Sequence, residues 1–180
     1  MKTLIDNIIK TDEFVSIYRG IDLQSFVFGK IIFADDVYYA LSSISPYGEK
    51  DGLLIAEINE ITKIEVGEKY NRKLEKICKI KNTVISGYEL SDNALLESAL
   101  QLSYKNQKVI SVNLIGDEHE NIVGIVEKIK DNVCTINLFD DYGFRNGMVH
   151  FYLHDVPLLS YDSKDENLLE ILINHNNTSG

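Results

Sequence analysis

The chain has 180 residues, of which 44% are hydrophobic and 26% are charged, and this balance is typical of a globular protein. It contains only 2 Pro and 11 Gly, which excludes disordered and collagen-like classes. The formal net charge is -10, opposite in sign to that of a protein that coats nucleic acid. Most of this negative charge lies in residues 91–180, which contain 6 Lys and Arg but 14 Asp and Glu.

The first predicted element is a helix near the N-terminus, because Leu4, Ile5, Ile8 and Ile9 fall on one helical face. Five segments rich in β-branched and aromatic residues follow and predict strands. They are residues 14–19, 27–33, 37–43, 53–58 and 61–66. A second helix is then predicted from the spacing of Tyr70, Leu74 and Ile77.

The second half of the chain repeats the first. A shift of 95 residues aligns residues 14–36 with 109–131, and residues 45–66 with 140–161, without a gap. The same elements are therefore predicted again: a helix from residue 91 to about 105, five strands, and a final helix. The strands are residues 109–114, 122–129, 133–139, 148–153 and 156–161, and the final helix contains Leu168, Leu169, Leu172 and Ile173. We interpret this pattern as an internal duplication.

Paired glycines and turn residues mark the same places in both copies. Gly29 and Gly124 lie inside the second strand of each copy, where a glycine indicates a bulge, a bend or a close backbone approach. Asp35-Asp36 and Asp131-Asn132 predict hairpin turns before the third strand of each copy. Asp51-Gly52 and Asn146-Gly147 predict tight turns before the fourth strands.

Five short antiparallel strands in about 55 residues favour a small closed barrel, since closure protects the sheet edges. The segments VFGKIIFADDVYYAL (27–41) and IVGIVEKIKDNVCTI (122–136) resemble the first motif of the Sm-like family, a variety of SH3-like barrel. LLIAEINEITKIEV (53–66) is placed like the second motif. The fold class predicted is mainly β with flanking helices: two tandem five-stranded Sm-like barrels, each preceded by an α-helix.

The corresponding domain organisation has four parts. Residues 1–80 form the first helix and barrel, residues 81–90 a packed connector, residues 91–174 the second helix and barrel, and residues 175–180 a disordered tail. The resemblance to the Sm-like family implies RNA binding and assembly through strand edges, and so a homo-oligomer through the barrel edges. The basic-Gly element of that family is replaced here by Asp51-Gly52 and Asn146-Gly147.

Residues with catalytic or metal-binding chemistry are few. His150 and His154 are predicted on one strand, which places them about 13 Å apart, too far for one metal ion. Cys78 and Cys134 form no C-x-x-C pair and are predicted to be buried thiols. The chain has no nucleophile elbow and no phosphate-binding loop. We therefore expect no enzyme activity and no cofactor.

Two groups of residues are candidates for binding. Tyr47 with Lys50, and Tyr142 with Phe144 and Arg145, place aromatic and basic groups at the loop before each fourth strand. The other candidate is the one basic run, residues 68–81, which favours contacts with phosphates or with the acidic second copy. Its candidate anion-binding residues are Lys69, Arg72, Lys73 and Lys76.

The sequence favours a non-catalytic interaction or regulatory module that binds a protein partner. One alternative is an Sm-like RNA-binding protein. The other is an acidic inhibitor or immunity-type protein, which would act through residues 116–120 or Asp140-Asp141. The N-terminus lacks the features of a signal peptide, and no apolar run is long enough to cross a membrane. We therefore expect a cytoplasmic protein without membrane partners.

Overall fold

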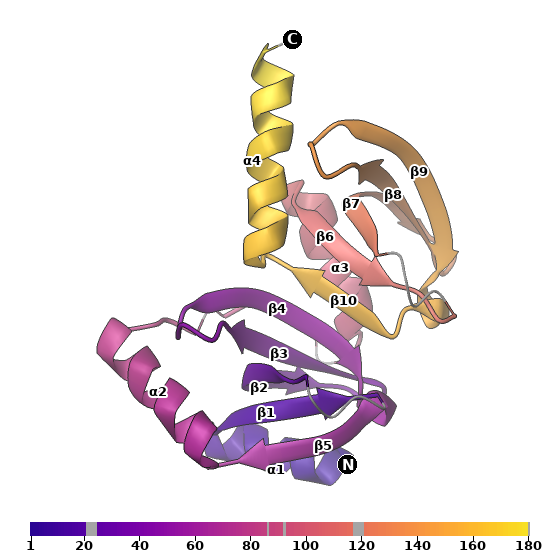
Figure 1. Cartoon of the computed structure of the whole chain (residues 1–180). Helices are drawn as coiled ribbons and strands as arrows, with labels where there is room; N and C mark the ends of the chain where they lie inside the picture. Colours follow the sequence, from indigo (N-terminus) through magenta and orange to yellow (C-terminus); the bar gives the residue numbers. More distant parts are fainter. Residues whose placement is uncertain (21–24, 86, 92, 117–120, 180) are drawn as a thin grey trace. The chain divides into compact units, whose positions relative to one another are not determined.

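The computed structural model describes all residues except 21–24, 86, 92, 117–120 and 180. The chain divides into two compact units, Met1–Leu95 and Leu96–Gly180. Each unit contains five antiparallel strands with helices at both ends of the strand series (Figure 1). The prediction of a mainly β chain with flanking helices is confirmed.

The first unit begins with helix α1 (Lys2–Thr11) and ends with helix α2 (Lys69–Lys81) and the segment that follows it. A short 3₁₀ turn, η1 (Ile58–Glu60), joins its last two strands. The strands are β1 (Phe14–Arg19), β2 (Val27–Ala34), β3 (Tyr38–Ile44), β4 (Lys50–Glu57) and β5 (Ile61–Val66).

The second unit repeats this order of elements. It contains helices α3 (Leu95–Asn106) and α4 (Lys164–Ser179) and the 3₁₀ turn η2 (Leu153–Asp155). Its strands are β6 (Val109–Asn113), β7 (Ile122–Lys130), β8 (Val133–Phe139), β9 (Arg145–Tyr152) and β10 (Leu158–Tyr161).

The strand pairing of the two units corresponds residue by residue. The strand order is β5-β1-β2-β3-β4 in the first unit and β10-β6-β7-β8-β9 in the second. Val15 lies opposite both Gly29 and Val66. Its counterpart Ile110 lies opposite Gly124 and Tyr161, so every partner is displaced by 95 residues.

Closed barrels are not shown. Among the described strands, β5 is paired only with β1, and β9 only with β8, so neither unit is closed by pairing its fourth and fifth strands. A closed barrel would leave neither unit with free sheet edges. Here β5 and β9 instead remain as edge strands of open sheets.

Each sheet packs against its own helices. In the first unit, α1 buries Ile5 and Ile8, and Leu74 and Cys78 of α2 pack with Phe28 and Ile44 of the sheet. In the second unit, the core includes Leu100 of α3, Ile110 and Val112 of β6, Ile136 of β8 and Ile173 of α4. The apolar periodicity that predicted these helices therefore corresponds to core contacts.

At Gly29 and Gly124 the backbones of neighbouring strands approach closely. This is one of the three structures that a glycine inside a strand indicated from the sequence. A Cβ atom built on Gly29 would lie 2.1 Å from the carbonyl oxygen of Ser42, on the neighbouring strand. On Gly124, the same atom would lie 2.1 Å from the carbonyl oxygen of Asn137. Only a residue without a side chain allows the strands to pair at this distance.

The hairpin turns before the fourth strands lie earlier than predicted. Asp51-Gly52 and Asn146-Gly147 fall inside β4 and β9, beside an irregularity in the pairing with the preceding strand. The tight turns are made by the residues around Gly48 and Gly143, which have φ angles of 72° and 80°. An aspartate or asparagine followed by glycine is compatible with either a β-bulge or a turn. Here the pairing with the preceding strand places both dipeptides in a bulge. The Asp131-Asn132 turn is confirmed, with φ angles of 53° and 61°.

The two segments predicted to lie between and after the barrels both contact the unit to which they belong. α2 continues to Lys81, and in the connector the Thr83 hydroxyl donates a hydrogen bond of 2.5 Å to the carbonyl oxygen of Gly48. The tail predicted as disordered from residue 175 is helical as far as Ser179. The Asn176 side chain donates a hydrogen bond to the carbonyl oxygen of Tyr142, which holds this part of α4 against the second unit.

Candidate functional site

The predicted interaction residues lie at the β3–β4 and β8–β9 loops and at the start of the following strands. The side chains of Tyr47 and Tyr142 are 72% and 75% exposed, and that of Phe144 is 58% exposed. Lys50 and Arg145 are the first residues of β4 and β9. The Lys50 ammonium lies over the ring of Tyr88, 4.9 Å from its centre, and so contacts the connector of its own unit.

The β8–β9 loop is fixed to helix α4. Asp140 accepts hydrogen bonds through Oδ1 from the backbone N–H groups of Tyr142 (3.0 Å) and Phe144 (2.9 Å). Asn176 of α4 donates to the carbonyl oxygen of Tyr142 at 2.9 Å. A Cβ atom on Gly143 would lie 2.7 Å from the backbone nitrogen of Ile173, so loop and helix are in direct contact.

Helix α4 adds exposed apolar side chains that the sequence analysis missed. Leu168 and Ile171 are 59% and 64% exposed. The apolar spacing predicted the helix but not which of its sides is buried, and in the structure Ile173 and the capping residue Glu166 take the buried positions. We call Tyr142, Phe144, Leu168 and Ile171 the α4–loop surface, because they project from two elements held together by the contacts above.

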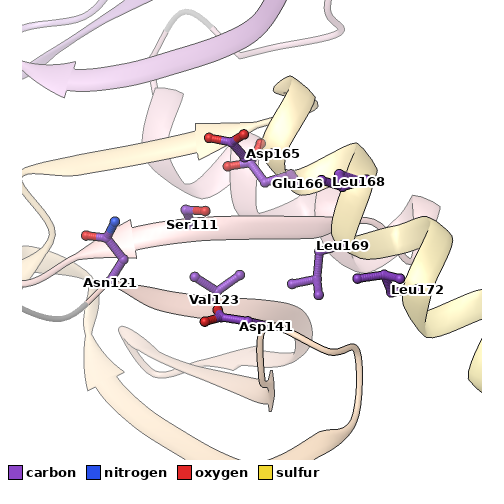
Figure 2. Close-up of a pocket in the computed structure, with 9 residues that line it drawn as sticks. All are labelled: Ser111, Asn121, Val123, Asp141, Asp165, Glu166, Leu168, Leu169 and Leu172. Carbon is purple, nitrogen blue, oxygen red and sulfur yellow. The ribbon is translucent and has the colours of Figure 1, made fainter.

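A cleft of about 270 Å³ lies between α4 and the sheet of the second unit (Figure 2). Leu169 and Leu172 point into it from α4, and Asp165 and Glu166 lie near the start of that helix (Figure 2). Asp141, from the β8–β9 loop, lines it as well. The remaining lining residues are Ser111, Asn121, Val123 and Leu168. The cleft thus combines an apolar wall with carboxylates.

The first unit has a cleft of about 350 Å³ at the equivalent place, between α2 and its own sheet. Five lining positions correspond after the shift of 95 residues. They are Phe26 and Asn121, Phe28 and Val123, Pro46 and Asp141, Tyr70 and Asp165, and Leu74 and Leu169. The position of the cleft is therefore shared by the two units, whereas its lining is aromatic in the first unit and acidic in the second.

Glu166 is a buried carboxylate at this cleft, with only 2% of its surface exposed. It accepts a hydrogen bond of 2.8 Å from the backbone N–H of Ser163, in the arrangement of a capping box at the start of α4. Burial raises the pKa of the Glu166 carboxyl, and hydrogen bonds from Ser163, Ser160 and Ser111 partly oppose the rise. The equivalent residue of the first unit is the neutral Asn71, which accepts a hydrogen bond of 2.6 Å from the Ser16 hydroxyl.

The predicted anion-binding residues all lie on exposed positions of α2. Within the described part of the chain, Lys69, Arg72, Lys73 and Lys76 make no ion pair. The two other lysines of this helix are paired, Lys79 with Glu75 at 2.6 Å and Lys81 with Glu49 at 2.8 Å. The ammonium of Lys73 lies 6.0 Å from the ring centre of Tyr70.

The two candidate metal-binding histidines, His150 and His154, have separate local contacts. His150 lies on β9 with its Nδ1 2.9 Å from the Thr135 hydroxyl, whereas His154 lies in η2, 3.6 Å from the Asp155 carboxylate. Only His150 is on the predicted strand. No group of three or more His, Cys, Asp or Glu suited to a metal ion occurs in the residues that the structure describes. Of the predicted acidic segment 116–120, residues 117–120, which include His119, lie outside the described residues.

Both cysteines are buried, and this leads to a testable expectation. Burial raises the pKa of the Cys134 thiol from 9.0 to about 12, and it also raises the pKa of Cys78. Since the thiolate is the reactive form, a rise of about three units lowers its population roughly a thousandfold. We expect iodoacetamide at mildly alkaline pH to leave Cys134 unmodified in the native protein and to alkylate it in urea, as followed by intact mass. Rapid labelling of native Cys134 would contradict its placement in the core.

Compared with known proteins, the chain matches no family model, no curated protein and no solved structure. The resemblance to the Sm-like family therefore stays a prediction from the sequence. No helix in the described part of the chain is long and apolar enough to cross a lipid bilayer.

Proposed function

We propose that this protein is a non-catalytic interaction module that binds a protein partner through the α4–loop surface of its second unit. The observation that carries the proposal is the exposure of Tyr142, Phe144, Leu168 and Ile171 on two elements in contact. Large exposed apolar side chains on neighbouring elements are typical of protein interfaces. Tyrosine is also among the residues that most often dominate binding energy.

The two units differ at the equivalent positions, which supports the assignment to the second unit. Where α4 has Leu168 and Ile171, α2 has Lys73 and Lys76. Polar and charged residues such as lysine are typical of the solvent-exposed face of a helix, whereas leucine and isoleucine are more often buried. The apolar residues on α4 are therefore better explained by a partner than by the needs of the fold.

The negative charge of the second unit indicates what charge its partner carries. Residues 96–180 carry 6 Lys and Arg against 13 Asp and Glu, a net charge of -7. Complementary charge accelerates association and disfavours partners of like charge. A basic partner is therefore favoured, as the inhibitor or immunity-type alternative also requires.

For the fold, we propose that each unit is an open variant of the Sm-like barrel and that the two arose by duplication. The support is the common order of elements and the constant displacement of 95 residues between corresponding strand partners. The Sm-like motifs in residues 27–41 and 122–136 add to it. Fold alone does not assign function, so the interaction surface and not this resemblance carries the functional proposal.

The proposal is tested by replacing Tyr142 and Leu168 together with alanine. The tagged protein and the variant are used to capture proteins from extracts of cells that express the chain, and captured proteins are quantified by mass spectrometry. Truncating a dominant interface residue costs about 2 kcal/mol or more, roughly thirtyfold in affinity. We therefore expect at least a tenfold loss of the specific partner.

The matched control is the double replacement Tyr47→Ala with Ile80→Ala in the first unit. It also removes one exposed tyrosine from a loop and one exposed aliphatic side chain from the following helix. We expect this control to capture the partner as the unmodified protein does. Equal capture by all three proteins, each shown to be folded by circular dichroism, would exclude the α4–loop surface.

A further inference from the structure

Three lysines make one continuous basic face on α2. Lys69, Lys73 and Lys76 are spaced by four and three residues, which places them on one side of the helix, and all three are exposed. Within the described residues none of them has an ion-pair partner. Ile80, 71% exposed, continues the same face by one further turn. This face thus combines unneutralised positive charge with an apolar end.

The cleft of the second unit has the complementary chemistry. Asp141 and Asp165 are exposed carboxylates at the cleft, and Leu169 and Leu172 form its apolar wall. A lysine side chain has the same two parts, an aliphatic stem and a charged end, and buries the stem against apolar groups while the ammonium stays near charge or water. The cleft of the first unit is lined by Phe26, Phe28 and Tyr70 at the corresponding positions and offers less negative charge.

We propose that the basic face of α2 in one copy of this protein docks on the acidic cleft of the second unit in another copy. The two surfaces attract each other, whereas two clefts or two basic helix faces would repel. The contact is therefore heterologous, because it joins different surfaces of the two copies. Such a contact adds copies to form either a closed ring or an open filament. The inference goes beyond the proposed partner surface, because its charged residues are Lys69, Lys73 and Lys76 on one side and Asp141 and Asp165 on the other. The cleft and the α4–loop surface share only Leu168 among the residues named for both.

The docking is tested by sedimentation velocity of the full chain over a range of protein concentrations and at two salt concentrations. Between about 0.1 M and 1 M salt, the screening length falls from about 10 Å to about 3 Å. We expect the average mass to rise with protein concentration at the lower salt and to return to that of a single chain at the higher salt.

Two charge-reversed variants identify the surfaces. One carries Lys69→Glu, Lys73→Glu and Lys76→Glu, and the other Asp141→Lys and Asp165→Lys. Each variant alone is expected to stay a single chain, with at least a tenfold weaker association. A mixture of the two is expected to associate again, because the first variant retains the acidic cleft and the second retains the basic helix.

The matched control reverses three exposed lysines elsewhere, Lys10→Glu, Lys105→Glu and Lys128→Glu, with the same change in net charge. It should associate as the unmodified chain does. Neutral versions, with glutamine for the three lysines and asparagine for the two aspartates, guard against misfolding of the reversed variants. A single chain at every concentration, or a mixture that does not associate, would overturn the proposal. So would salt-sensitive binding of labelled single-stranded RNA by a monomeric chain, lost in the lysine variant, because it would assign this face to RNA.

Discussion

Replacing Gly29 or Gly124 with alanine is expected to destabilise the unit that carries it by about 3 kcal/mol, because the added methyl group has no space. The nearest atoms are backbone carbonyl oxygens, 2.1 Å from the position of the new Cβ in both cases. A flexible side chain could move aside, but here the neighbouring strand itself must shift. The hydrogen bonds between the second and third strands of that unit would be lost with it.

The effect is measured by hydrogen exchange with mass spectrometry, which follows peptides from each unit separately. Gly29→Ala should lower protection mainly in residues 14–66, and Gly124→Ala mainly in residues 109–161. Gly87→Ala is the matched control, since a Cβ atom there would meet nothing within 4 Å and φ is not in the left-handed region. Unchanged protection in both strand variants would refute the close approach between the second and third strands.

The strands were predictable from local patterns. β1 and β8 begin and end where their β-branched and aromatic residues predict, and the two glycines of β2 and β7 already indicated an unusual backbone contact. The repeated pattern in the sequence helped, because each uncertain segment could be compared with the segment 95 residues away. Local sequence therefore determined the elements and their order.

Features that depend on pairing or on several segments were not predictable. Asp51-Gly52 became a bulge rather than a turn because of how β4 pairs with β3, which no local pattern records. The cleft of the second unit draws its lining from separate segments, including β6, β7, the β8–β9 loop and α4. The exposure of Leu168 depends on how α4 rotates against the sheet, and a helix with apolar residues on more than one side leaves that rotation open.

Glu166→Gln is expected to stabilise the second unit near neutral pH and to remove one component of its pH dependence. Burial is the main cause of the raised pKa of Glu166, so the ionised carboxylate is disfavoured inside the folded unit. Because the pKa of Glu166 is higher in the folded than in the unfolded state, this group stabilises the fold at pH values below its unfolded pKa, near 4.5. That stabilisation is lost as the pH rises through the pKa of the folded state.

Glutamine keeps the size of the side chain and an oxygen that can accept from the Ser163 N–H, and both residues serve in a capping box. In the first unit, the equivalent buried position is occupied by an uncharged amide, that of Asn71. Thermal unfolding between pH 4 and 8 should therefore show the variant gaining stability over the unmodified protein as pH rises. Asp165→Asn, which removes a charge from the exposed neighbouring residue, serves as the control and should not reproduce this gain. A constant difference at every pH would mean that Glu166 acts through its shape and hydrogen bonds and not through its charge.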